Sequence, residues 1–123
     1  MVAQTVETLH EKRCRPCESG IARFSHDEAD AYLTMLQGWR LSHDGFRITK
    51  EWLVKDFQAG IDFFNRVAQV AEEENHHPEL HLAGYRHVQI DLWTHAIGGL
   101  SENDFIMAAK IDRLPVELKE PGL

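Results

Sequence analysis

Residues 56–94 read DFQAGIDFFNRVAQVAEEENHHPELHLAGYRHVQIDLWT, and this stretch decides the fold. Its first half carries apolar residues at spacings of four, three, four and three, which are Phe57, Ile61, Phe64, Ala68 and Ala71. Because an α-helix turns once in about 3.6 residues, this spacing places them in one stripe. We predict a helix over residues 56–74 and take it as the main helix of the core.

A long strand is predicted to follow this helix. Pro78 stops helical continuation, and residues 85–94 then alternate polar and apolar side chains, with Val88, Ile90 and Leu92 on one face. This strand is expected to pair with a further strand around residues 80–83 or with a second subunit. The residues leave that choice open.

Two shorter helices are predicted from capping-box patterns, in which a serine is followed three residues later by an acid. Ser25 to Glu28 begins a helix over roughly residues 26–37, which Gly38 ends. Ser101 to Asp104 begins a second one that runs to about Leu114.

A β-hairpin is predicted at Asp44-Gly45, between alternating residues 39–43 and 46–49. Helices in this order with antiparallel strands indicate an α+β domain whose helices cover one face of the sheet. Residues 1–24 lack clear periodicity and are interpreted as an N-terminal extension. Residues 25–123 form the single expected domain.

Composition limits the classes of function. With 123 residues, of which 43% are hydrophobic, the chain can bury one modest core. Its formal net charge of −7 disfavours nucleic-acid binding, which needs clustered lysine and arginine. We find no apolar run long enough to span a bilayer and no signal-peptide pattern at the first residues, so we expect a cytoplasmic protein whose partner is a small molecule or another protein.

Ionisable side chains are concentrated between residues 72 and 104. His76 and His77 precede Pro78, which restricts the backbone, and His95 follows the long strand. Imidazole has an ordinary pKa of about 6.5 and can give or take a proton near neutral pH. We therefore read these residues as a proton-transfer site, although solvated surface histidines remain an alternative.

Two acids flank these histidines. By its angular position on the predicted helix, Glu72 is expected to face inward, whereas Glu73 and Glu74 are expected to face solvent. A purely solvated Glu72 stays open as an alternative. Helix capping alone would also account for Asp104.

Metal and nucleophile chemistry are the weaker interpretations. Cys14-Arg15-Pro16-Cys17 has the spacing of half a zinc site, completed by His10 or His26, but we expect a reduced, non-catalytic loop. A second set is conceivable, formed by His76, His77, His81 and His95. Adjacent side chains rarely converge on one ion, so we expect no metal.

In these residues the sequence resembles the pterin-4a-carbinolamine dehydratase family. The family pattern is met by Glu72, His76-His77-Pro78, Tyr85 after six residues, His95 after nine and Asp104 after eight. The similarity extends from about Ser25 to Leu114. It implies a four-stranded antiparallel sheet with three helices packed on one face, assembled as a homodimer or homotetramer.

The resemblance also implies an activity, the dehydration of a 4a-hydroxytetrahydropterin, such as that of tetrahydrobiopterin, to a quinonoid dihydropterin without any cofactor. His76 and His95 would be the acid/base groups, and His77 would orient the pterin. The residues that bind or orient the substrate and the imidazoles would be Glu72, Pro78, Tyr85 and Asp104.

The sequence departs from the animal enzymes in three ways: Asn103 stands where an arginine is frequent, Leu80 stands in place of a tryptophan, and one residue is added before Tyr85. These departures, with the cysteine pair, suggest a bacterial branch. Some proteins of this fold are rubisco assembly factors, and residues 76–82 resemble theirs, so that role is the alternative. A transcription-factor partner, as in animal members, has no support in this acidic chain.

Overall fold

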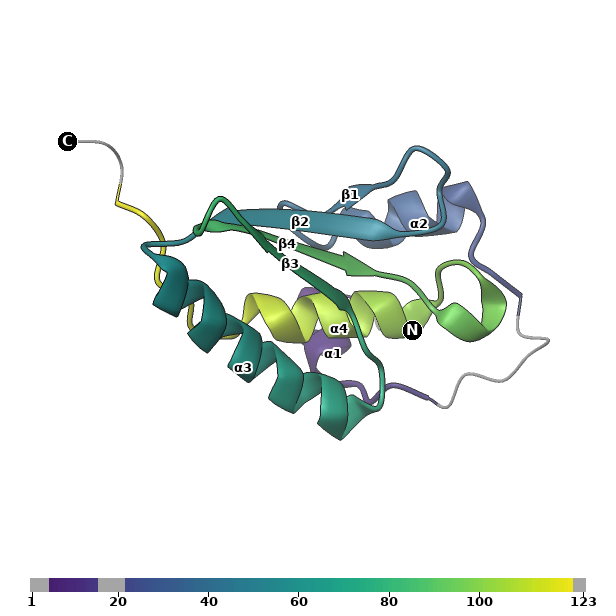
Figure 1. Cartoon of the computed structure of the whole chain (residues 1–123). Coiled ribbons are helices and arrows are strands. Elements are labelled where there is room, and N and C mark those ends of the chain that lie inside the picture. Colours follow the sequence, from purple (N-terminus) through teal and green to yellow (C-terminus); the bar gives the residue numbers. More distant parts are fainter. Residues whose placement is uncertain (1–4, 16–21, 121–123) are drawn as a thin grey trace.

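A four-stranded antiparallel sheet forms the centre of the computed structural model, which describes residues 5–15 and 22–120. The strand order is β1-β2-β4-β3 (Figure 1). The strands are β1 (Arg40–Leu41), β2 (Ile48–Leu53), β3 (Glu79–Ala83) and β4 (His87–Leu92). Since β4 pairs with β2 on one side and β3 on the other, the long strand finds both partners within its own chain.

Two helices cover one face of the sheet, as Figure 1 shows: α3 (Phe57–Glu74) and α4 (Glu102–Asp112). Helix α2 (His26–Leu33) lies against β1 and ends earlier than predicted. The predicted α+β class with its four-stranded antiparallel sheet is confirmed. No helix in the described ranges has the length and apolar character that crossing a bilayer requires.

A fourth helix, α1 (Val6–Glu11), lies within the expected extension. Thr5 caps it, and its Leu9 is fully buried where α1 packs on α4. The described residues 5–15 are therefore attached to the domain more closely than the absence of periodicity suggested. A six-residue helix shows too little periodicity for sequence reasoning to detect.

The core lies between the sheet and helices α3 and α4. Ile48, Ile90 and Leu92 of the sheet and Phe63 and Val67 of α3 are all fully buried. Burying each such side chain contributes about 1.5–3 kcal/mol.

The predicted apolar stripe of α3 is wrong except at Ala71, because the helix is rotated about its axis relative to the prediction. The side chains facing the core follow one another by four, four, four and three residues, and they are Ala59, Phe63, Val67, Ala71 and Glu74. Phe57 is 53% exposed instead. Both sets have helical spacing, and the sheet selects the face on which Gly60 allows close approach, since a Cβ there would lie 3.1 Å from the Leu82 side chain.

Candidate active site

His76 is positioned by the end of α3. Asn75 ends this helix in the left-handed conformation, with φ of 52° and ψ of 42°, which reverses the chain direction. The His76 amide then donates to the Ala71 carbonyl at 3.1 Å. As a result the imidazole turns toward the first turn of α4, where its Nε2 lies 2.7 Å from Oδ1 of Asp104. His76 is 8% exposed and Asp104 is completely buried.

Asp104 combines the two roles that the sequence left as alternatives. Its Oδ2 accepts hydrogen bonds from the Ser101 amide at 3.0 Å and from the Thr94 hydroxyl at 2.9 Å, so it caps α4 while holding His76. An ionised carboxylate only accepts hydrogen bonds, and the helix N-terminus favours its negative charge. His76 Nε2 therefore carries the proton in this pair, which leaves Nδ1 as a base.

His77 pairs with Glu72 outside the core. The Nε2 of His77 lies 2.7 Å from Oε2 of Glu72, and the two side chains are 56% and 77% exposed. The prediction that Glu72 faces inward is thus wrong, and so is the prediction that Glu74 faces solvent. Glu74 continues the buried face of α3 and is only 9% exposed, because the helix is rotated from the predicted orientation.

His95 reaches the same region from the end of β4. It begins a short 3-10 helix, η1 (His95–Ile97), inside a loop closed by the bond from the Thr94 amide to the Gly99 carbonyl at 2.8 Å. Its ring stacks on Trp93, with centroids 4.3 Å apart and planes 25° apart. The guanidinium of Arg47 also lies over the Trp93 ring, at 4.6 Å.

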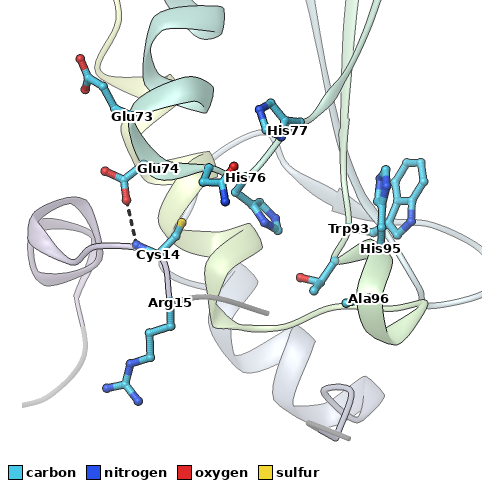
Figure 2. A pocket seen from close by; sticks show the side chains of 11 residues that line it. Cys14, Arg15, Glu73, Glu74, His76, His77, Trp93, His95 and Ala96 are labelled. Carbon is cyan, nitrogen blue, oxygen red and sulfur yellow. Dashed lines mark hydrogen bonds between the residues drawn. The ribbon is translucent and has the colours of Figure 1, made fainter. Parts of the chain in front are cut away.

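These three histidines line one cavity of about 520 Å³. Figure 2 shows His76 at its centre, with Trp93 and His95 on one side and Cys14 and Arg15 on the other. Binding sites for small molecules commonly enclose about 300–1,000 Å³, so a flat bicyclic compound fits this volume. The three histidines that the sequence assigned to one site thus lie around one cavity.

Four of the predicted residues do not line the cavity. Glu72 and Asp104 bond its histidines, and Pro78 and Tyr85 complete the four. Pro78 is half-buried and joins His77 to β3. Tyr85 lies in the turn between β3 and β4, is 57% exposed, and contacts the guanidinium of Arg86. Strand β3 carries the chain away from the histidines, and β4 brings it back. Tyr85 lies in the turn at the far end of this strand pair, and the five residues of β3 span about 16 Å.

Sequence reasoning missed the part of the wall that the N-terminal residues form. Cys14 and Arg15 line the cavity next to Glu74 and His76. The only signal was the cysteine pair, and Cys17 lies outside the described residues. Asn103, noted only as a departure from the animal enzymes, bonds the Arg15 backbone.

The histidine quartet considered for a metal is not assembled. His81 lies on β3, where its Nε2 is 3.2 Å from Asp91 and 3.7 Å from Glu79. Within residues 5–15 and 22–120, Glu79, His81 and Asp91 are the group whose atoms lie close enough to share an ion, and they do not line the cavity with His76.

Comparisons with known proteins point to one family. Residues 22–114 match the family model described as Pterin 4 alpha carbinolamine dehydratase. The chain is 49% identical over 112 residues to pterin-4-alpha-carbinolamine dehydratase 2, mitochondrial, of Arabidopsis thaliana, covering 89% of this chain but only 60% of that protein. It is 47% identical to a putative pterin-4-alpha-carbinolamine dehydratase of Dechloromonas aromatica, covering 86% and 92% of the two chains.

A solved structure has the same fold. The crystal structure titled transcriptional coactivator/pterin dehydratase from Brucella melitensis superposes with a TM-score of 0.69 at 33% identity. The match covers 74% of this chain and 96% of that one. By the extent of the family match and of these identities, the chain belongs to the pterin-4a-carbinolamine dehydratase family.

Proposed function

We propose that this protein is a hydro-lyase that dehydrates a 4a-hydroxytetrahydropterin to a quinonoid dihydropterin and water, as its family relatives are named to do. The observation that carries the proposal is the convergence of three imidazoles on one cavity, with the most buried of them held by Asp104. Recycling of a tetrahydropterin is the physiological setting that we propose for the reaction.

The reaction moves one proton from nitrogen to oxygen overall. The C4a–O bond breaks as an acid protonates the departing hydroxyl, and a base removes the proton of the neighbouring ring nitrogen, so that a C=N bond forms and water leaves. No electrons are gained or lost. Both transfers need a positioned proton donor or acceptor, and a positioned acid or base contributes roughly 10²–10⁴-fold.

We assign the base to His76. Its Nε2–H points at Asp104, so the lone pair of Nδ1 is available, and the imidazolium that forms on proton uptake is stabilised by the carboxylate. His95 is assigned as the acid because it lies across the cavity on the Trp93 ring. His77, tied to Glu72 at the rim, orients the pterin in this proposal.

Assembly into a homodimer or homotetramer is part of the proposal. Two features support it: β3 is an edge strand with one unpaired side, and the outer face of α3 exposes Phe57 next to the half-buried Ile61 and Phe64. A cytoplasmic location stays a prediction. No observation among the described residues favours rubisco assembly over catalysis.

The test is a dehydratase assay on the wild type, His76→Ala and His95→Ala, with folding followed by circular dichroism. A folded but at least about 100-fold slower His76→Ala is expected. His87→Ala is a matched control, because His87 lies on β4 away from the cavity. Undiminished activity in both cavity variants would refute the histidine mechanism, and an inactive, well-folded wild type would refute the enzyme assignment.

A further inference from the structure

We propose that residues Lys12–Arg15, here called the N-terminal segment, form a substrate-binding wall of the catalytic cavity, and that Glu74 and Asn103 are the positioning residues that hold this wall in place. The inference rests on the proposed function and adds substrate contacts outside the histidine motif. Cys14 and Arg15 line the cavity opposite Trp93 and His95 (Figure 2).

Glu74 anchors the segment to the end of α3. Its Oε1 accepts the Cys14 amide at 2.8 Å, and its Oε2 lies 3.4 Å from Arg13 and 3.6 Å from Lys110. The Glu74 side chain is only 4% exposed. A carboxylate so deeply buried must be compensated by partners, and here part of that compensation comes from the N-terminal segment itself.

Asn103 anchors the segment to the start of α4. The Arg15 amide donates to Asn103 Oδ1 at 2.9 Å, while Asn103 Nδ2 donates to the Arg15 carbonyl at 2.7 Å. The Cys14 thiol lies 3.6 Å from the Asn103 carbonyl. One buried amide thus satisfies both backbone groups of Arg15, an arrangement that fixes the position and direction of the chain.

A third attachment lies further from the cavity. Lys12 Nζ is 3.0 Å from Glu102, whose same oxygen accepts the Tyr32 hydroxyl at 2.7 Å. Burial opposes ionisation of Glu102, but these hydrogen bonds hold its pKa below the ordinary value. Because Leu9 of α1 is buried where this helix packs on α4, the segment is held at both its ends.

The two anchors are neighbours of the chemistry. Glu74 is two residues before His76, and Asn103 directly precedes Asp104, which bonds His76. The wall itself carries no group assigned to proton transfer. Displacing it should therefore weaken substrate binding and leave the chemical step nearly intact, which appears as a higher KM at unchanged kcat.

The central variant is Asn103→Leu, which removes both hydrogen bonds to Arg15 at similar volume. We expect KM to rise about tenfold and kcat to stay within about threefold, while hydrogen exchange at the Arg15 amide accelerates. Asn103→Asp keeps the acceptor and loses the donor, so its KM should lie between those of the wild type and Asn103→Leu. It also serves as the second variant if the leucine variant does not fold.

Asp112→Asn is the matched control, because Asp112 bonds Trp39 and Lys50 at the other end of α4. Its KM and its Arg15 exchange should equal those of the wild type. Faster hydrogen exchange at the Arg15 amide of Asn103→Leu with an unchanged KM would overturn the inference. A tenfold fall in the kcat of Asn103→Leu would also overturn it, because the anchor would then act through His76. If the wild type is inactive, the proposed function fails, but the proposed substrate-binding wall can still be tested. The affinities of wild type and Asn103→Leu for a dihydropterin are then measured by calorimetry. Equal affinities would overturn the wall, and a lower affinity of Asn103→Leu would support it.

Discussion

Replacing Asp104 by asparagine is predicted to remove most of the activity by changing the tautomer of His76. Asparagine has one acceptor oxygen where aspartate has two, yet the Asp104 carboxylate serves His76 with Oδ1 and both Thr94 and Ser101 with Oδ2. If the amide oxygen keeps the Ser101 N–H, the amide NH₂ faces His76 Nε2. That nitrogen must then accept, so the ring proton moves to Nδ1, where the base is needed.

The magnitude follows from the bonds that are lost. A hydrogen bond to a charged group contributes about 1.5–3 kcal/mol, and a helix cap about 0.5–2 kcal/mol. Because the asparagine oxygen keeps the cap, only the charged hydrogen bond is lost, and we expect Asp104→Asn to lower the free energy of unfolding by about 1.5–3 kcal/mol. The loss of a positioned base should lower kcat by about 10²–10⁴-fold.

The assay is stopped-flow dehydration of a freshly generated 4a-hydroxytetrahydropterin, with urea unfolding on the same preparations. Ser101→Ala is the control, since it removes the Ser101 hydroxyl, which bonds the Thr94 hydroxyl at 2.7 Å, and leaves the Asp104 carboxylate on His76 and on the Ser101 amide. Ser101→Ala should lower the free energy of unfolding by about 1 kcal/mol and keep kcat within about threefold of the wild type. An Asp104→Asn protein whose kcat stays within threefold of the wild type would refute the role given to the His76–Asp104 pair.

Three further outcomes are expected. Phe63→Ala should lower the free energy of unfolding by about 3–5 kcal/mol, because Phe63 is fully buried and meets Trp52 edge-on at 5.1 Å; a urea-measured loss under about 1 kcal/mol would contradict this packing. Tyr85→Ala should leave KM and kcat within about twofold, since Tyr85 stands outside the cavity; a tenfold change in either would place it in the site. Burial raises the pKa of Asp112 although Lys50 donates a hydrogen bond to it, so the folded chain binds the carboxyl proton more tightly than the unfolded chain does. The contribution of Asp112 to stability should therefore fall as pH rises from the ordinary carboxyl pKa through the raised one. The difference in unfolding free energy between wild type and Asp112→Asn, measured by urea titration across the acid range, should therefore fall with pH, and a rising difference would contradict the direction.

Local patterns accounted for the elements well. The capping serines Ser25 and Ser101, the strand alternation at Val88 to Leu92 and the stop at Pro78 all depend on neighbouring residues, and each is found where the pattern placed it. The hairpin strands are shorter than predicted at β1 and extend further at β2. Strand ends depend on which partner residues remain to be paired, and these lie elsewhere in the chain.

The histidines of the site could be proposed from spacing and family resemblance, but their environments could not. Glu72 and Glu74 differ by two positions on one helix, and their burial is opposite to the prediction. Helix α3 has apolar residues on both sides, so periodicity alone does not decide which side the sheet covers. The sheet covers the side on which Gly60 lies close to Leu82, and this contact joins segments more than twenty residues apart.

By itself, then, the sequence determined the main elements from residue 25 onward, the family, and the three histidines that line the cavity, because these follow from short-range spacing and residue type. Only the tertiary structure decided which acid is buried, which imidazole is held by Asp104, and that Cys14 and Arg15 line the cavity. These outcomes depend on packing and hydrogen bonds between segments as far apart as Arg15 and Asn103, whose contact leaves no periodic trace in the chain.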